Sequence, residues 1–206
     1  MPPAAKKPST VVKPAREKTD TRERILRATL RVIGEHGVEA VSNRRLAKEA
    51  GVALGSLTYH FPSQTELLRE SLLLYVNEEV ARLNAIAETI RAGEPTVEQV
   101  AAEVERIFIS YVYGPEQIAE LELHLQAARD PELQDASRRC FAAYDDVAIA
   151  ALQALRLPAT EVHARAVVAL VSGVALRFLG TGVRDDSGLA LALTTLARGA
   201  ETSPDS

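Results

Sequence analysis

Apolar and polar residues follow a helical period in the first regular segment of the chain. Apolar side chains recur from Ile25 to Val32 at spacings of about three and four residues, which places them on one face of a helix. Asp20 precedes this stretch and Glu23 follows Asp20 by one helical turn, a pairing that commonly caps the amino-terminal end of a helix. The pattern predicts a first helix over residues 20–37.

Two short segments with clear end signals follow. Ser42 is a favoured N-cap residue, and Gly51 suits the left-handed position that ends many helices, so a second helix is expected between them. A third helix is expected over residues 53–59. Ser63 and Glu66 form another capping pair and open a long helix.

The remaining chain predicts further helices separated by proline and glycine residues. Thr96 with Gln99 restarts the helical pattern after the break AGEPT at residues 92–96. Later breaks fall at Gly114-Pro115, Asp130-Pro131 and Leu157-Pro158, and the last two helices are expected over residues 160–179 and 187–199. The sequence shows no alternating strand of useful length and no internal repeat. We therefore predict an all-α protein with about nine helices.

Charge is distributed unevenly along this framework. Up to residue 70 the chain has 13 Lys and Arg against 8 Asp and Glu, whereas the rest has 11 against 20. A basic first third on an acidic remainder fits a nucleic-acid-binding unit attached to a larger unit that does not bind nucleic acid. A chance scatter of charge is the alternative.

Cysteine usage and hydropathy bear on the compartment. Cys140 is the single cysteine, which fits a reducing cytoplasm, and we expect it to be buried as a small apolar residue. No uninterrupted apolar run reaches the roughly 18–20 residues of a membrane helix, and the first ten residues lack the apolar stretch of a secretion signal. A cytoplasmic protein without membrane contact is expected.

The second and third predicted helices carry an unusual surface. Leu57 and Phe61 would anchor the third helix from its inner side, which leaves small or hydroxyl-bearing residues around Gly55 on the outer side. Small residues let a helix backbone approach base edges in the major groove, and free N–H groups at helix starts favour phosphate. The predicted DNA-binding residues are Ser42, Arg44, Arg45, Lys48, Ala53, Leu54, Gly55, Ser56, Thr58, Tyr59, His60 and Ser63.

Residues 21–68 resemble the DNA-binding head of the TetR family of bacterial transcriptional regulators. The resemblance is carried by EHGVEAVS (residues 35–42), AKEAGV (47–52) and GSLTYHF (55–61). It implies a helix-turn-helix whose third helix binds operator DNA, a homodimer, and a variable carboxy-terminal domain that takes a small-molecule inducer. Thr58 stands where relatives often have a second aromatic residue, and Arg45 where an acidic residue is common.

The expected division of the chain follows from these features. We predict a helix-turn-helix head (residues 20–62) and a helical effector-binding and dimerisation body (63–200), with a disordered basic arm (1–19) and a frayed tail (201–206) at the ends. The arm either contacts a DNA groove or is a solvated tail. The resemblance implies a repressor of a palindromic operator that a small molecule releases. The alternative is a DNA-binding protein whose body binds a protein partner.

The last two predicted helices are apolar on nearly every side, and a helix of that kind must be covered. Pairing with the same helices of a second copy would cover them, whereas packing within one subunit is the alternative. The residues proposed for the dimer interface are Val167, Leu170, Val171, Val174, Leu189, Leu193 and Leu196.

Polar and aromatic residues in the body are candidates for lining a ligand pocket. They are Phe108, Tyr111, His124, Arg129, Phe141, Tyr144, Arg177 and Phe178. The spacing of glutamates around His124 argues against a metal site, and no metal or cofactor is expected. The sequence also lacks the motifs of metalloproteases, phosphate-binding loops and nucleophile elbows, so an enzyme is not expected.

Overall fold

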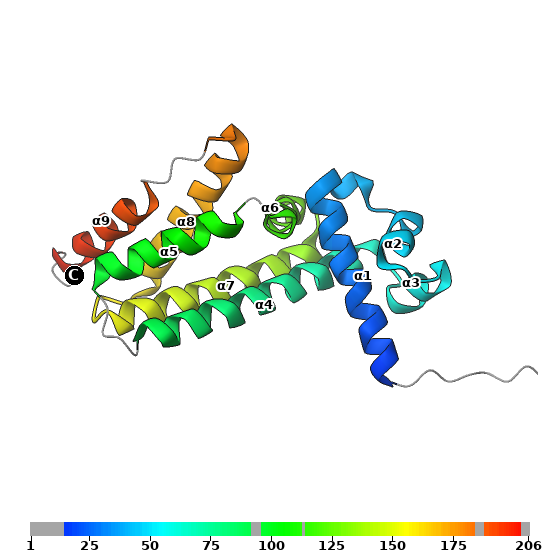
Figure 1. The fold of residues 1–206 in the computed structure, drawn as a ribbon, viewed down its shortest axis with the longest axis horizontal. Helices are drawn as coiled ribbons and strands as arrows, with labels where there is room; N and C mark the ends of the chain where they lie inside the picture. The colour runs from blue at the N-terminus through cyan, green and yellow to red at the C-terminus, as the bar shows by residue number, and fades with distance from the viewer. Residues whose placement is uncertain (1–14, 92–95, 113, 184–187, 203–206) are drawn as a thin grey trace, which may run out of the picture.

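The computed structural model describes residues 15–91, 96–112, 114–183 and 188–202, and this part of the chain contains helices and no strand (Figure 1). The predicted all-α class is confirmed, with nine α-helices and a short 3₁₀ helix in these residues. In Figure 1 the first three α-helices gather at one end and the chain ends at the other. The described structure is therefore elongated, with the head and the carboxy terminus far apart.

The head contains three α-helices and one short helical turn. Their bounds are α1 (Ala15–His36), η1 (Val38–Ala40), α2 (Asn43–Ala50) and α3 (Leu54–His60). The Ser42 side chain accepts a hydrogen bond from the Arg45 backbone N–H at 3.4 Å, and Gly51 ends α2 in the left-handed region at φ 63°. Both predicted end signals of the second helix are confirmed.

The start of α1 differs from the prediction. The helix begins at Ala15, so Asp20 and Glu23 lie within it rather than at its end, and residues 15–19 are helical rather than part of a disordered arm. Glu23 instead accepts hydrogen bonds from Arg27 one turn later in the helix, the closest at 2.8 Å. An acidic pair at this spacing also occurs inside helices, where it pairs with basic residues. Residues 1–14 lie outside the described part.

The core of the head is filled by residues of all three α-helices and the first turns of the next one. Leu67 of α4 (Gln64–Arg91) packs in the same cluster as Leu46 and Leu57, and all three are at most 2% exposed. The other buried members are Ile25, Leu26, Ala28, Val32, Ala50 and Phe61. Because α4 also continues into the body, this helix joins the two units.

The body contains the remaining helices, with ends close to those predicted. They are α5 (Val97–Tyr111), α6 (Pro115–Ala127), α7 (Pro131–Ala154), α8 (Glu161–Thr181) and α9 (Leu189–Thr202). Thr96 and Gln99 make both hydrogen bonds of a capping box. Asp130 caps α7 and Thr160 caps α8 through their side chains. The predicted breaks before α5, α6, α7 and α8 are confirmed.

Two apolar clusters hold the body together. Helices α4, α6 and α7 meet around Leu72, Leu123, Leu133 and Cys140, each of which is completely buried. The expected burial of the single cysteine is confirmed, and this burial raises the pKa of the Cys140 thiol to about 12. The second cluster joins α5, α8 and α9.

The head and body touch where α1 crosses α6. A side-chain Cβ at Gly34 would lie only 1.8 Å from the backbone oxygen of Pro115, so glycine permits this close approach. The Val38 N–H also donates to Glu122 Oε1 at 2.7 Å. Helix α6 is thereby fixed against the end of α1.

Candidate DNA-recognition face and ligand-binding hollows

Helix α3 presents the outer face that the sequence predicts. Leu57 and Phe61 are 1% and 3% exposed and point into the head, whereas Leu54 and Tyr59 are 53% and 68% exposed. Among the described residues, no side chain or neighbouring backbone lies within 4 Å of a Cβ built on Gly55. Helix α3 therefore offers an open surface where its backbone can approach a partner closely.

The flanking residues add groups that bind phosphate. Arg44, Arg45 and Lys48 are exposed on α2, and Ser42 and Ser63 lie at the starts of α2 and α4. The Ser63 hydroxyl accepts from the Glu66 N–H at 3.1 Å, as the predicted cap requires. All twelve residues predicted to bind DNA belong to this surface and are exposed or half-buried. Their contact with DNA stays a prediction.

Arginines of α1 hold this surface in position, and sequence reasoning missed them. Arg24 Nη2 donates to the carbonyl oxygens of Ala50 and Gly51 at 2.7 and 3.0 Å. These carbonyls end α2, so Arg24 fixes the turn that leads to α3. Spacing alone did not distinguish Arg24 from an ordinary solvated residue, since it lies on the polar face of an amphipathic helix.

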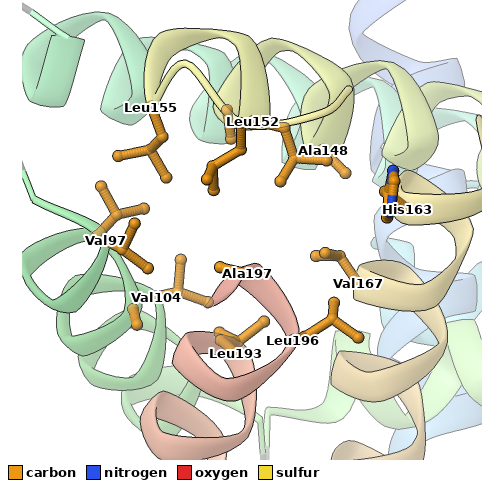
Figure 2. A pocket seen from close by; sticks show the side chains of 14 residues that line it. Val97, Val104, Ala148, Leu152, Leu155, His163, Val167, Leu193, Leu196 and Ala197 are labelled. Atoms are coloured by element: carbon orange, nitrogen blue, oxygen red, sulfur yellow. The ribbon is translucent and has the colours of Figure 1, made fainter. Parts of the chain in front are cut away.

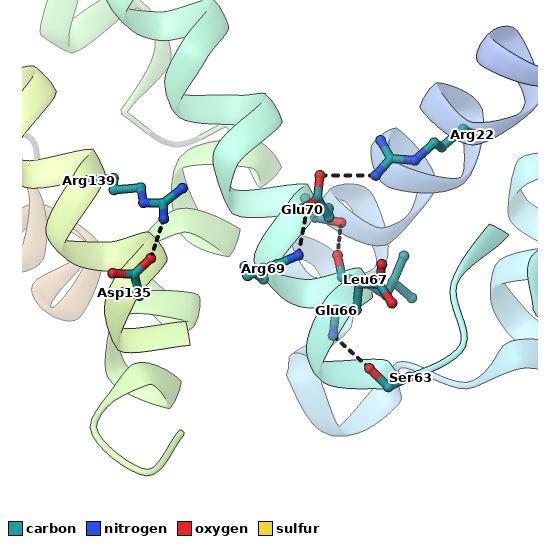
Figure 3. A network of polar contacts seen from close by, with 9 residues as sticks. Arg22, Ser63, Glu66, Leu67, Arg69, Glu70, Asp135 and Arg139 are labelled. Atoms are coloured by element: carbon teal, nitrogen blue, oxygen red, sulfur yellow. Dashed lines mark hydrogen bonds and ion pairs between the residues drawn. The ribbon is translucent and has the colours of Figure 1, made fainter. Parts of the chain in front are cut away.

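A second arginine joins α1 to the residue after α3. Arg22 lies over the Phe61 ring, with Cζ 5.1 Å from the ring centroid, and its Nη2 donates to Glu70 Oε2 at 3.0 Å. Glu70 also accepts from Arg69 at 3.0 Å, and Figure 3 shows this network beside the Ser63 cap. The position of α3 is therefore fixed from both of its ends.

The body contains an apolar cavity between α5, α7, α8 and α9. Its volume is about 90 Å³, and Figure 2 shows aliphatic side chains pointing into it from these helices. His163 is its polar lining residue, and the His163 Nδ1 lies 2.8 Å from the Thr160 hydroxyl. The other lining residues are Val97, Val100, Ala101, Val104, Ala148, Ala151, Leu152, Leu155, Leu157, Val167, Leu193, Leu196 and Ala197.

This cavity changes the picture of the predicted dimer face. Val167, Leu193 and Leu196 line it, and the other four proposed residues pack in the cluster around Phe108 and Phe178. The predicted set therefore faces mainly inward within one chain. Sequence spacing could not orient α8, since the helix is apolar on every side. The exposed large apolar residues of α8 and α9 are Val162, Leu176 and Leu191, with exposures of 72%, 60% and 69%.

Helix α8 is exposed to an unusual degree for its composition. By length and mean hydropathy (1.6) it could cross a membrane, and only 11% of its most apolar segment is buried within the chain. Length and hydropathy alone do not separate a membrane helix from one that a partner covers. His163, Arg165 and Arg177 lie within the helix, and charged residues are costly inside a bilayer.

A second, polar hollow lies between α4 and the first turn of α6. Its volume is about 430 Å³. Its lining combines carboxylates with an aromatic ring and an amide: Tyr75, Glu78, Glu79, Arg82, Gly114, Pro115, Glu116 and Gln117. Glu79 is only 9% exposed and forms an ion pair with Arg82. The hollow is large enough for a small organic molecule.

A hydrogen-bonded layer extends from this hollow between α6 and α7. Gln117 Nε2 donates to the Tyr75 hydroxyl at 2.6 Å, and one turn further along α6 Glu120 Oε1 accepts from the Tyr144 hydroxyl at 2.7 Å. Burial and the nearby charge of Glu120 raise the pKa of Tyr144. Tyr144 therefore stays a neutral phenol that donates to the carboxylate.

His124 completes this layer. Its Nδ1 lies 2.7 Å from the Ser137 hydroxyl, and its ring stacks on Phe141 with centroids 4.7 Å apart. The His124 Nε2 is buried 3.5 Å from Glu120 Oε1, but the geometry is not that of a hydrogen bond, and this nitrogen has no hydrogen-bond partner among the described residues. A buried unsatisfied nitrogen is uncommon and marks this layer for function.

Comparison with known proteins identifies the chain. Residues 25–71 match the family described as bacterial regulatory proteins, tetR family, and residues 95–200 match the tetracyclin repressor-like carboxy-terminal domain. The second match alone covers more than half of the chain. The protein belongs to the TetR family of transcriptional regulators. The predicted resemblance is confirmed, and the family consists of DNA-binding regulators rather than enzymes.

Curated relatives match this TetR protein over different lengths. The nicotine-responsive transcriptional repressor HdnoR of Paenarthrobacter nicotinovorans is 27% identical over 77% of this chain and 84% of its own. The regulator BetI of Agrobacterium fabrum is 34% identical over 54% of this chain and 53% of its own. The regulator PksA of Bacillus subtilis is 44% identical over 32% of each chain. The chain thus spans only about a third and a half, respectively, of PksA and BetI.

Solved structures agree with the TetR assignment over most of the length. The multidrug binding protein EbrR in complex with ethidium has a TM-score of 0.69 and 31% identity, over 86% of this chain and 98% of that one. A TetR family member from Streptomyces coelicolor A3 has a TM-score of 0.70 and 31% identity over the same shares. The fold of head and body together is therefore that of the family.

The structure brings together only some of the predicted ligand residues. His124, Phe141 and Tyr144 lie in the polar layer behind the hollow, whereas Phe108 and Phe178 pack against each other in a core cluster, with ring centroids 5.6 Å apart. Arg129 and Arg177 are exposed, and the Tyr111 side chain lies outside the described part. None of the eight is among the residues that line the apolar cavity in the described structure.

Sequence reasoning missed the groups that give the polar hollow its character. Tyr75, Glu79, Gln117 and Glu120 lie on two different helices, and glutamates on amphipathic helices usually face solvent. No signal in the sequence marks these glutamates as partly buried. Within the residues that the structure describes, no group of three or more metal-binding side chains is found.

Proposed function

We propose that this TetR protein is a cytoplasmic repressor that binds a palindromic operator as a homodimer and releases it when a small molecule binds the body. The observation that carries this proposal is the outer face of α3, which is open around Gly55 and firmly anchored through Leu57 and Phe61. Such a helix fits the major groove.

The proposed roles of the DNA-binding residues follow from their positions. Arg44, Leu54, Gly55, Ser56 and Thr58 would face base edges, and the remaining predicted residues would mainly contact phosphates. Tyr59 supports this division, because its hydroxyl is exposed at the far end of α3, where a groove-bound helix meets the DNA backbone. Phosphate contacts fix the register of the helix and base contacts supply the sequence preference.

Exposed apolar surface on α8 supports the homodimer. Val162, Ala169, Gly173 and Leu176 are exposed and repeat along α8 with spacings close to those of one helix face. Leu191 of α9 is also exposed. Small residues between larger apolar ones let two helices approach closely, so a second copy would bury this stripe in a four-helix arrangement.

A two-fold dimer sets the geometry of the operator. Two copies of α3 related by a two-fold axis must meet half-sites separated by one turn, about 34–36 Å, or a multiple of it. An effector that favours another separation of the heads would weaken DNA binding. A coupling of about 1–3 kcal/mol would change affinity several-fold to about a hundredfold.

The contact between α1 and α6 offers a route for this coupling. The first turn of α6 lines the polar hollow, and the same turn lies against Gly34 of α1. A molecule that displaced α6 would therefore displace α1 and the head. The nicotine-responsive relative and the EbrR complex with ethidium support a small-molecule effector for this chain.

The proposal is tested by selecting bound sequences from random duplex DNA. The selected site should be palindromic, and replacing Ser56 and Tyr59 together with alanine should lower affinity for it by about tenfold or more, because base and phosphate contacts are lost. Arg138→Ala, an exposed arginine of the body, is the matched control. Unchanged binding by the double variant would contradict the assignment of α3.

A further inference from the structure

We infer that the polar hollow between α4 and α6 binds an organic cation with a flat aromatic body, and that the carboxylates of Glu116 and Glu120 select it. The claim that this cation acts as the effector rests on the proposed function. Binding itself does not, since it follows from the charges and surfaces of the body.

The charge balance around the hollow is negative. Glu78 pairs with Arg27 of α1, and Glu79 pairs with Arg82. In contrast, Glu116 and Glu120 have no arginine or lysine partner in the described part of the chain. Two carboxylates without a fixed counter-charge create a local field that attracts a cation.

The whole body strengthens this field. Residues 71–206 carry 20 Asp and Glu against 11 Arg, and the chain has no lysine after Lys48. A flexible lysine could otherwise have reached the hollow and neutralised its carboxylates. An anionic ligand would meet net repulsion throughout this region, and a neutral one would gain nothing from the carboxylates.

The surfaces beside the carboxylates suit an aromatic body. The Tyr75 ring lines the hollow and is held by Gln117, while Tyr144 and Phe141 flank the deeper layer with Glu120. Glu120 uses Oε1 to accept from Tyr144, and its Oε2 has no hydrogen-bond donor among the described residues. An aromatic cation could stack on a tyrosine and place its charge toward this free oxygen.

The apolar cavity does not offer these features. Its lining is aliphatic apart from His163, and its volume of about 90 Å³ is far below the 430 Å³ of the polar hollow. A charged molecule there would lose its hydration without a carboxylate to replace it. The polar hollow is therefore the site to which we assign the cation.

The test uses three probes of similar shape and different charge on the full chain: 1-methylquinolinium, its neutral parent quinoline, and the anion 1-naphthoate. Calorimetric titration should show binding of the cation, with the neutral and anionic probes at least about tenfold weaker. Glu116→Gln combined with Glu120→Gln should weaken the cation by at least about tenfold and leave quinoline unchanged. Glutamine keeps the size of each side chain and an acceptor for Tyr144.

The matched control is Glu132→Gln combined with Asp146→Asn, which removes the same charge from exposed positions of α7. Helical circular dichroism and thermal unfolding establish that both double variants are folded. Equal binding of quinoline and the cation, full retention of cation binding by the hollow variant, or no cation binding at all would each overturn the inference. Operator binding is measured separately, so cation binding without DNA binding would remove the proposed function and leave this site standing.

Discussion

The head and the body differ in how completely one chain fills and covers them. The head buries its apolar residues in a single cluster with α4, and the arginines of α1 satisfy the carbonyls and carboxylates around it. The body contains an apolar cavity, a polar hollow and a helix whose apolar side is exposed. The head is thus a finished unit whose outer face needs only DNA, whereas the body has surfaces that a second copy and a ligand would complete.

The sharpest test of this comparison lies where the two units meet. Gly34→Ala places a methyl group against the Pro115 backbone, which cannot move away without displacing α6. We expect a loss of about 3 kcal/mol in the free energy of unfolding, measured by urea denaturation. Gly180→Ala is the control, because nothing in the described structure lies within 4 Å of its added Cβ. Equal stability of the two variants would show that the units are not in firm contact.

The exposed stripe of α8 gives the next largest effect. Leu176→Glu places a charge on the surface that we assign to the dimer, and the dimer dissociation constant should rise by about a hundredfold or more, as measured by sedimentation. Leu125→Glu alters an equally exposed leucine on α6 and should leave the dimer unchanged. A dimer that tolerates Leu176→Glu but not Leu125→Glu would move the interface to α6.

A smaller effect is expected at the turn of the head. Arg24→Met removes two charge-assisted hydrogen bonds from the end of α2, at a partly solvated position, and should cost about 1 kcal/mol of stability. DNA affinity should fall with it, because α3 is less firmly placed. Arg106→Met removes an exposed arginine of α5 and should have no measurable effect on either quantity. An equal response of both variants would argue against the role of Arg24.

The smallest effect concerns the buried thiol. The pKa of Cys140 is about 12 in the folded protein and about 9 when exposed, so its contribution to stability is fully present below pH 9 and is lost as pH rises toward 12. At neutral pH the native thiol should react with a disulfide reagent only as fast as the protein opens. Rapid modification of the native protein would show that the core around Cys140 is accessible.

The sequence predicted the head well because local signals decide its structure. Ser42 and Gly51 fix the ends of α2, and the spacing of Leu57 and Phe61 fixes which side of α3 faces outward. These signals depend on residues close together in the chain, so a single sequence contains them. The start of α1 was missed because an acidic capping pattern also occurs inside a helix.

The body was predicted less completely because its sites depend on contacts between distant segments. Glu120 and Tyr144 meet across α6 and α7, and Tyr75 and Gln117 across α4 and α6, and no spacing pattern reveals such pairs. The exposed side of α8 could not be chosen either, since apolar residues surround that helix. His124 and Tyr144 were found by composition alone.

Stoichiometry on DNA tests the central claim most directly. The full chain should be bound to its selected duplex and its mass measured by native mass spectrometry, with footprinting on the same complex. The account predicts two chains per palindrome, or a multiple of two, with protected half-sites separated by about one helical turn or a multiple of it. One chain bound to an unsymmetric site would contradict it, because the exposed stripe of α8 would then have no second copy to cover it.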